Sequence, residues 1–350
     1  MNVALLRLAA QRIVGGKSTS PVDVVRHLLA LQGQDLAGGK WAIGVRAPNV
    51  TRADVDAALA AREIVRSWPM RGTLHLLAAE DLKWLLALGA PGVITGSQRR
   101  RTQLGLDAKT LAKAQDVAER ALAGGKRLSR DALIELWNRA GLDAEPHRAY
   151  HVIWYLAQHA VLCQGPDEQF VLVDEWIREH RFFDRHGSRF AGHDRDEALG
   201  ELARRYFTSH GPATLVDLSR WVKLPQRDIK IGLAIASKSL AHDDGYYFAP
   251  GLAAPRSAAT SCVLLPGFDE LILGYSDRTA TLGAAHEQLI VPGGNGVFKA
   301  TIVAGGRVVG TWKKKPGKRL VVEPSPFGKK LPAGLDKAIA AYRRFLGADS

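Results

Sequence analysis

The sequence predicts an α+β protein built from three tandem winged-helix modules and a β-rich C-terminal segment with a basic β-hairpin. One order of elements, three helices and then a two-stranded hairpin, recurs three times, and afterwards the pattern changes to short apolar runs separated by glycines. The chain of 350 residues is also longer than one hydrophobic core usually supports. The expected modules are 1–100, 101–192 and 193–255, and the C-terminal segment is 256–350.

A helix cap defines the first module. Ser20 is an N-cap residue and is followed by Pro21, which is tolerated at the first helical position because its missing N–H would have no partner there. Val24, Val25 and Leu28 then lie on one helix face. The expected elements are helices at 3–13, from 21, and at 51–62, then two strands within 64–77 around Met70-Arg71-Gly72.

The second and third modules repeat this order with the same kinds of signal. Ser129 caps a helix that Gly141 ends, and Thr214 caps another after the break at Gly211-Pro212. The second module is expected to contain helices at 108–123, from 130 and at 147–160, and a hairpin at 161–173. The third is expected to contain helices at 197–209, 215–222 and 226–237, and a hairpin at 240–248.

The C-terminal segment is predicted to be mainly β-structure. Strands are expected at 262–265, 271–273, 297–303, 307–312 and 320–322, with a final helix at 335–346. The strands at 297–303 and 307–312 form a hairpin that turns at Gly305-Gly306. Three further glycine pairs, at 15–16, 38–39 and 293–294, are interpreted as turns.

The charge of the chain favours a polyanionic partner. Lys and Arg number 48 against 35 Asp and Glu, which gives a net charge of +13, and most of the excess lies between Lys299 and Arg344. A concentrated basic surface attracts nucleic acid, whereas the alternative is a solvated lysine-rich loop without a partner. The candidate DNA-binding residues here are Arg307, Lys313, Lys314, Lys315, Lys318 and Arg319.

Composition excludes several other classes of protein. No apolar run approaches the roughly 18 residues of a membrane span, and two cysteines form neither a disulfide scaffold nor a cysteine-ligated zinc site, so a cytoplasmic protein is expected. The sequence contains no P-loop, dinucleotide fingerprint or nucleophile elbow, and no cofactor is expected. His180, His186 and His193 lie among acidic residues, but a solvated linker is favoured over a metal site.

One short segment carries polar groups suited to catalysis. Gln32 and Gln34, separated by Gly33, direct their amides to the same side only on extended or turning backbone. Each amide accepts and donates hydrogen bonds without taking a charge, so two convergent glutamines can hold a water molecule and direct its oxygen at an electrophile. From this pair alone, a polar turn between helices is the more usual interpretation.

The wider motif set resembles the AlkZ/YcaQ-type winged-helix DNA glycosylases. The resemblance extends over essentially the whole chain, and its combined motifs are specific. They are Gln32-Gly33-Gln34, Trp41-Ala42 with Arg46, Arg66-x-Trp68-x-Met70-Arg71-Gly72-Thr73-Leu74-His75, Leu264-Leu265-Pro266-Gly267-Phe268-Asp269-Glu270 with Gly274-Tyr275-x-Asp277-Arg278, and Gly305-Gly306-Arg307-Val308-Val309-Gly310-Thr311-Trp312.

This resemblance implies removal of alkylated purines, including interstrand crosslinks, by an enzyme of the Gln-x-Gln branch. Gln32 and Gln34 would be the catalytic pair, and Gly33 departs from the aliphatic residue usual between them. Asp35 is a nearby carboxylate that more often pairs locally than acts as a base. No lysine is placed for lyase chemistry, with Lys40 the one residue that would contradict a monofunctional enzyme.

Further expectations concern the partner. Arg71 and His75 are candidates for contacts around the lesion or its phosphate, whereas the alternative for His75 is a structural role in a strand. Double-stranded DNA is the expected partner and a monomer the expected state. A non-catalytic DNA-binding regulator or genotoxin-resistance protein is the main alternative, and a protein–protein scaffold is the third. The sequence does not specify the lesion.

Overall fold

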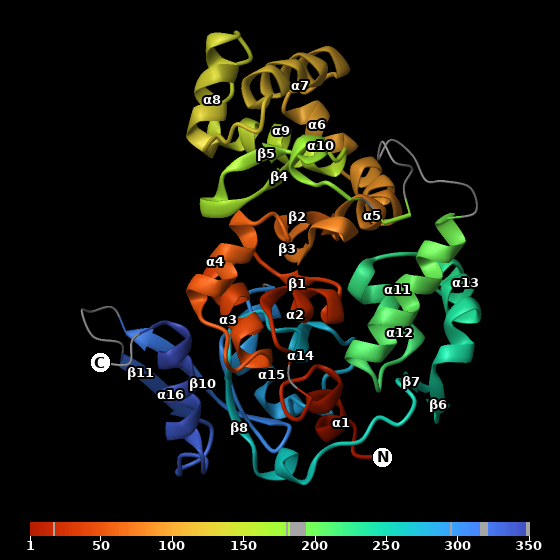
Figure 1. Cartoon of the computed structure of the whole chain (residues 1–350), viewed down its shortest axis with the longest axis vertical. Coiled ribbons are helices and arrows are strands. Elements are labelled where there is room, and N and C mark those ends of the chain that lie inside the picture. Colours follow the sequence, from red (N-terminus) through yellow and green to blue (C-terminus); the bar gives the residue numbers. More distant parts are fainter. Residues whose placement is uncertain (17, 180, 183–193, 295, 316–320, 348–350) are drawn as a thin grey trace. The chain divides into compact units, whose positions relative to one another are not determined.

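The computed structural model describes the whole chain except residues 17, 180, 183–193, 295, 316–320 and 348–350 (Figure 1). Helices and strands are mixed along the chain, which confirms the α+β class. The chain forms two compact units. The terminal unit combines Met1–Ala57 with Leu199–Ser350, and the central unit is Ala58–Ala198.

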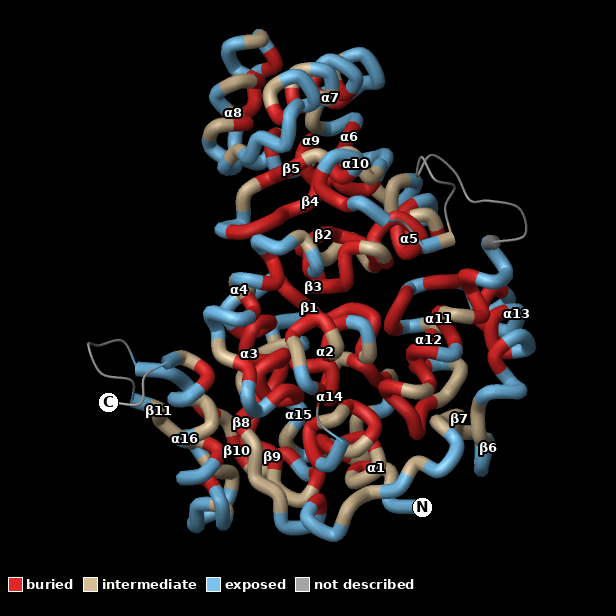
Figure 2. Tube along the Cα trace, viewed as in Figure 1, coloured by how far each residue is buried: buried red, intermediate tan, exposed pale blue. Residues whose placement is uncertain are grey.

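The terminal unit contains most of the expected helices. Its helices are α1 (Val3–Ala10), α2 (Pro21–Leu28), α3 (Leu36–Arg46), α11 (Asp194–His210, which begins just before the unit), α12 (Leu215–Val222), α13 (Gln226–Ala236), α14 (Glu270–Leu273), α15 (Glu287–Ile290) and α16 (Leu335–Phe345). The cap of α2 is as predicted, because Ser20 Oγ accepts the Asp23 N–H at 3.1 Å. Val24, Val25 and Leu28 are buried (Figure 2).

A four-stranded antiparallel sheet in the order β11-β10-β9-β8 forms the C-terminal part of this unit. Its strands are β8 (Cys262–Leu265), β9 (Thr301–Ala304), β10 (Arg307–Lys315) and β11 (Val321–Pro326). The predicted turn between β9 and β10 is present, with positive φ angles of 53° at Gly305 and 81° at Gly306. Helix α16 packs on β8 and α3.

The central unit contains strands β3-β2-β4-β5 in one sheet, so the first and second predicted hairpins lie side by side. The strands are β2 (Ile64–Met70), β3 (Thr73–Ala78), β4 (Leu162–Gln164) and β5 (Phe170–Leu172). The helices are α5 (Leu82–Gly96), α6 (Gln98–Gln103), α7 (Ala108–Leu122), α8 (Arg130–Arg139), α9 (Pro146–Gln158) and α10 (Val173–Trp176). Trp137 is fully buried at its core.

The remaining elements are helix α4 (Arg52–Ala60), which crosses from one unit to the other, strand β1 (Leu31–Gln32), and the hairpin of β6 (Ala241–Asp243) and β7 (Tyr246–Phe248). The helices and hairpins expected in each of the three repeated segments are therefore present in the expected order. No helix within the described part of the chain is long and apolar enough to cross a membrane.

Some local predictions were wrong. The strand expected at 271–273 is the short helix α14, whose N-cap Asp269 accepts the Leu271 N–H at 2.9 Å. The glycine pair at 38–39 lies inside α3 rather than in a turn. A Cβ at Gly38 would come within 3.3 Å of Pro266 Cβ, so this glycine allows close packing. Strand β9 begins only at Thr301, and residues 293–294 lie in a short 3-10 turn.

Candidate active site

The two predicted glutamines lie in the terminal unit, on the short connection between α2 and α3. Helix α2 ends at Leu28, β1 covers Leu31–Gln32, and α3 begins at Leu36. The backbone is thus extended and then bent at this point, as the Gln-x-Gln spacing requires. Gln32 is buried, whereas Gln34 is exposed.

The two amides converge. The Gln32 side-chain Nε2 donates to Gln34 Oε1 at 2.7 Å, and the Gln34 backbone N–H donates to Gln32 Oε1 at 2.9 Å. Each of the two carbonyl oxygens has two lone pairs and accepts one of these bonds. The arrangement therefore presents two fixed carbonyl acceptors that belong to neutral groups.

A buried glutamate holds the backbone of this segment. Glu270 Oε1 accepts the Gln32 backbone N–H at 3.1 Å, and Glu270 Oε2 accepts the indole N–H of Trp221 at 2.8 Å. His210 Nε2 lies 3.6 Å from the same Oε2. Glu270 is 1% exposed, so its carboxylate is solvated by these protein groups rather than by water.

A second buried carboxylate stands beside it. Asp269 forms a two-pronged ion pair with Arg46, in which Nη1 and Nη2 lie 2.8 and 2.9 Å from the two carboxylate oxygens. Arg46 also donates to the backbone oxygens of Gln11 and Ala42 and to Gln11 Oε1. This pair joins α3 to the N-cap of α14, next to Glu270.

Aromatic residues enclose the carboxylates. Tyr206 stacks on His210 with ring centroids 4.7 Å apart, and the Tyr275 hydroxyl donates to the His210 backbone oxygen at 2.8 Å. Burial raises the pKa of Tyr206 and of Tyr275 above the usual tyrosine range, so both remain neutral donors.

Sequence reasoning did not assign a role to Glu270, Asp269, Trp221 or His210. The only signal was the Asp-Glu pair inside the motif that carried the family resemblance. Two adjacent carboxylates next to the apolar run Leu271–Leu273 suggest burial, and a buried carboxylate needs donors. Those donors are supplied from segments far away in the sequence.

The other residues near the glutamines have structural partners or remain exposed. Asp35 is exposed at the N-cap position of α3 and makes no capping bond with its side chain. The Lys40 ammonium forms an ion pair with Asp56, and the Lys40 side chain is only 10% exposed. This ion pair holds the Lys40 ammonium on Asp56.

Arg71 and His75 lie in the central unit, on the β2–β3 hairpin. His75 is fully buried, with Nδ1 2.8 Å from the Thr73 backbone oxygen and Nε2 3.1 Å from the Arg71 guanidinium. Its role in the fold is therefore to orient Arg71, which is partly exposed. A contact of Arg71 with DNA stays a prediction.

The lysines of β10 alternate between the two faces of the sheet. Lys313 and Lys315 share Glu323 across the strand pair, with both Nζ–Oε distances at 3.1 Å. Lys314 is exposed and, by strand alternation, points to the other face. Arg307 is exposed and donates to the Thr279 backbone oxygen at 3.0 Å. Lys318 and Arg319 lie outside the described residues.

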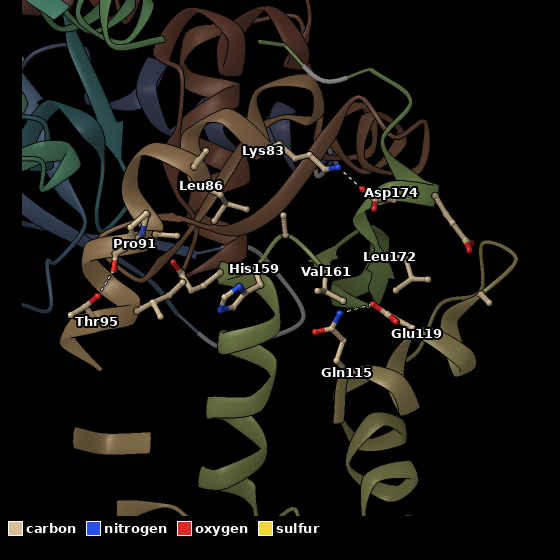
Figure 3. Close-up of a pocket in the computed structure, with 17 residues that line it drawn as sticks. Lys83, Leu86, Pro91, Thr95, Gln115, Glu119, His159, Val161, Leu172 and Asp174 are labelled. Carbon is tan, nitrogen blue, oxygen red and sulfur yellow. Dashed lines mark hydrogen bonds and ion pairs between the residues drawn. The ribbon is translucent and has the colours of Figure 1, made fainter. Parts of the chain in front are cut away.

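A separate groove of about 990 Å³ lies in the central unit (Figure 3). Its wall includes the Lys83–Asp174 ion pair and the Gln115–Glu119 hydrogen bond of 2.8 Å. Neither Gln32 nor Gln34 lines this groove. His180, His186 and His193, considered for a metal site, lie outside the described residues.

Comparison with known proteins identifies the class. The fold is that of a solved DNA glycosylase, AlkZ of Streptomyces sahachiroi, with a TM-score of 0.78 and 24% identity over 99% of this chain and 96% of that one. A relative from the same organism, described as an interstrand DNA cross-link repair glycosylase, is 25% identical over 96% of this chain and 93% of its own length.

The family model for DNA glycosylase AlkZ-like proteins matches residues 25–345, which include both glutamines and both buried carboxylates. The chain therefore belongs to the AlkZ-like DNA glycosylase family, and the predicted family is confirmed.

Proposed function

We propose that this protein is a monofunctional DNA glycosylase that hydrolyses the N-glycosidic bond of alkylated purines, using a water molecule positioned by Gln32 and Gln34. The observation that carries this proposal is the convergence of the two amides, which are bonded to one another at 2.7 Å. The carbonyl oxygens of the two amides accept both protons of one water, whose oxygen then faces the substrate.

The proposed step needs no strong general acid. An N7-alkylguanine carries a positive charge, so when the bond from C1′ of the sugar to N9 breaks, the electron pair passes to the base, which leaves as a neutral molecule. The water oxygen bonds to C1′, and one of its protons passes to solvent. Amide dipoles directed at the oxocarbenium-like sugar stabilise the transition state.

The proposal extends to interstrand crosslinks. A crosslinked base stays attached to the opposite strand and cannot be extruded into a tight pocket. Gln34 is exposed and Gln32 lies just beneath it, so the pair is accessible from the surface of the terminal unit. The family relative described as a cross-link repair glycosylase supports this substrate class.

We further propose that the three repeated segments are winged-helix modules and that the protein binds double-stranded DNA as a monomer. The hairpins β2–β3, β4–β5 and β6–β7 follow three helical segments and stand where wings would be. Lys314 and its neighbours on β10 are proposed to contact phosphates, and Arg71 is proposed to contact DNA near the lesion. No cofactor is needed for this hydrolysis.

Release of 7-methylguanine from a defined duplex tests the proposal. Gln32→Ala and Gln34→Ala should each abolish most base release while the Kd for DNA stays within about twofold, because the amides act on water rather than on the backbone. Gln226→Ala, at an exposed amide on α13, is the matched control and should keep full activity.

Two outcomes would overturn the proposal. Wild-type protein that binds DNA tightly yet releases no base from either a methylated or a crosslinked duplex would indicate a non-catalytic DNA-binding protein. Release that persists in both glutamine variants would place the catalytic water elsewhere. Heat-and-alkali cleavage of the abasic product, with and without borohydride trapping, also tests the monofunctional character, since a lyase forms a trapped Schiff base.

A further inference from the structure

We infer that Glu270 is a positioning residue for the Gln-x-Gln segment: its buried carboxylate fixes the Gln32 backbone and thereby sets the direction of both amides. This inference rests on the proposed catalytic role of Gln32 and Gln34. It concerns a residue that touches neither water nor DNA and acts through its hydrogen bond to the Gln32 N–H, 3.1 Å long.

The backbone before Gln32 is strained and needs an anchor. Leu29 adopts φ 69° and ψ −50°, and the Ala30 N–H donates to the Leu28 oxygen at 2.8 Å, which defines a γ-turn with a branched residue at positive φ. Leu29 is fully buried. Such a conformation persists only where surrounding contacts determine it. The Glu270–Gln32 bond supplies one contact three residues after the strained position.

Further contacts fix the position of the Glu270 carboxylate. The Trp221 indole N–H occupies its second oxygen at 2.8 Å, and His210 Nε2 lies 3.6 Å from that oxygen. Neighbouring Asp269 is bound by both nitrogens of the Arg46 guanidinium. A carboxylate whose two oxygens have different, fixed donors cannot rotate without losing one of them, so Gln32 is held in one orientation.

The two acceptor oxygens of the Glu270 carboxylate are therefore important to the geometry of the glutamine segment. An ionised carboxylate offers two acceptor oxygens, and here both N–H donors use one each. A glutamine at this position has the same shape but one acceptor oxygen, and its NH2 group would face the remaining N–H. In Glu270→Gln, either Gln32 or Trp221 must lose its acceptor.

This difference between a carboxylate and an amide can be tested with one variant and a second substitution that should restore part of its rate. Glu270→Gln should lower the single-turnover rate of 7-methylguanine release at least tenfold with the Kd for DNA unchanged, because misplacing reacting groups by about 1 Å costs up to a hundredfold. The double variant Glu270→Gln, Trp221→Phe removes the competing indole donor, so the amide oxygen is free to accept the Gln32 N–H. Its rate should rise at least threefold above that of the single variant.

A purely structural role predicts the opposite order. Trp221 is 1% exposed, and removing its N–H would then only add a second defect, so the double variant would be no faster than Glu270→Gln alone. Asp217→Asn is the matched control, since Asp217 is 2% exposed and accepts N–H groups from Thr214 and Ser276 rather than from the glutamine segment. It should lower thermal stability without changing the single-turnover rate.

Hydrogen exchange of the Gln32 amide tests the contact without any activity. Its protection should fall at least tenfold in Glu270→Gln and recover in the double variant, even if the wild-type protein released no base and the proposed function failed. Equal protection of Gln32 in the wild type and Glu270→Gln would overturn the positioning role, as would a double variant no faster than the single one.

Discussion

Removing Arg46 should destabilise the terminal unit severely, because this side chain forms an ion pair with Asp269, whose carboxylate is fully buried. Arg46→Met keeps an unbranched, flexible side chain but removes the guanidinium group, so Asp269 loses both nitrogens at 2.8 and 2.9 Å. The Arg46 and Asp269 side chains are 1% and 0% exposed, so water does not replace the lost bonds. Breaking a buried ion pair from one side typically costs about 3–5 kcal/mol.

Urea unfolding followed by intrinsic fluorescence measures this cost. With an m value of about 2–3 kcal/mol per molar, a loss of that size moves the midpoint of the terminal unit down by roughly 1–2.5 M. The control is Arg204→Met: Arg204 makes the same two-pronged contact with Glu201 at 2.7 and 2.8 Å, but its side chain is 45% exposed. That variant should lose less than about 1 kcal/mol.

A double variant separates the cost of an unpaired charge from the value of the pair. Arg46→Met, Asp269→Leu removes both charges of this pair, although the Leu271 N–H loses its cap. Its loss should be at least about 1 kcal/mol smaller than the sum of the two single variants. Equal costs for Arg46→Met and Arg204→Met, or strict additivity in the double variant, would refute the reasoning from burial.

Three further outcomes follow from local contacts. Gly232→Ala places a Cβ 2.3 Å from the Leu199 backbone oxygen, so α13 must shift, and thermal denaturation should show a loss of about 1–3 kcal/mol or more. His27 has its pKa lowered from 6.5 to about 4, chiefly by burial. As the pH falls, the unfolded chain therefore takes up a proton at His27 before the folded chain does. The resulting contribution to the free energy of unfolding, about 3 kcal/mol, is present above pH 6.5 and is lost as the pH falls towards 4. His27→Gln should flatten that part of the pH–stability curve. Burial also raises the pKa of the Cys163 thiol. A disulfide reagent should therefore modify Cys163 only as the protein unfolds, whereas half-buried Cys262 should react first; equal native rates would contradict this.

Structural features that depend on a few neighbouring residues were predicted correctly from the sequence. The Ser20 cap, the glycine turn at 305–306 and the extended backbone at the Gln-x-Gln segment each depend on local geometry. The sequence therefore identified the catalytic candidates and predicted the order of helices and hairpins around them.

Contacts between segments far apart in the sequence could not be predicted in this way. The bond from Gln32 to Glu270 joins positions 238 residues apart, and Arg46 meets Asp269 across 223 residues. Nothing in local periodicity indicates which buried carboxylate meets which donor. The prediction of a turn at 38–39 was wrong for the same reason, since the packing of Pro266 against Gly38 joins segments far apart in the sequence. Whether the three repeated segments act as separate winged helices stays a prediction.

The proposed site also predicts which lesions are excluded. Gln32 and Gln34 are neutral and donate no proton at physiological pH, while the nearest buried carboxylate, Glu270, has both oxygens bonded to N–H groups and is unsuited to act as an acid. A base that is uncharged before cleavage, such as uracil, would have to leave as an anion without such help. The rate of base release should therefore fall by several orders of magnitude from 7-methylguanine to uracil in the same duplex context, with DNA affinity unchanged. Comparable single-turnover rates on both lesions would show that the site contains a proton donor, and would refute hydrolysis by a water held between two neutral amides.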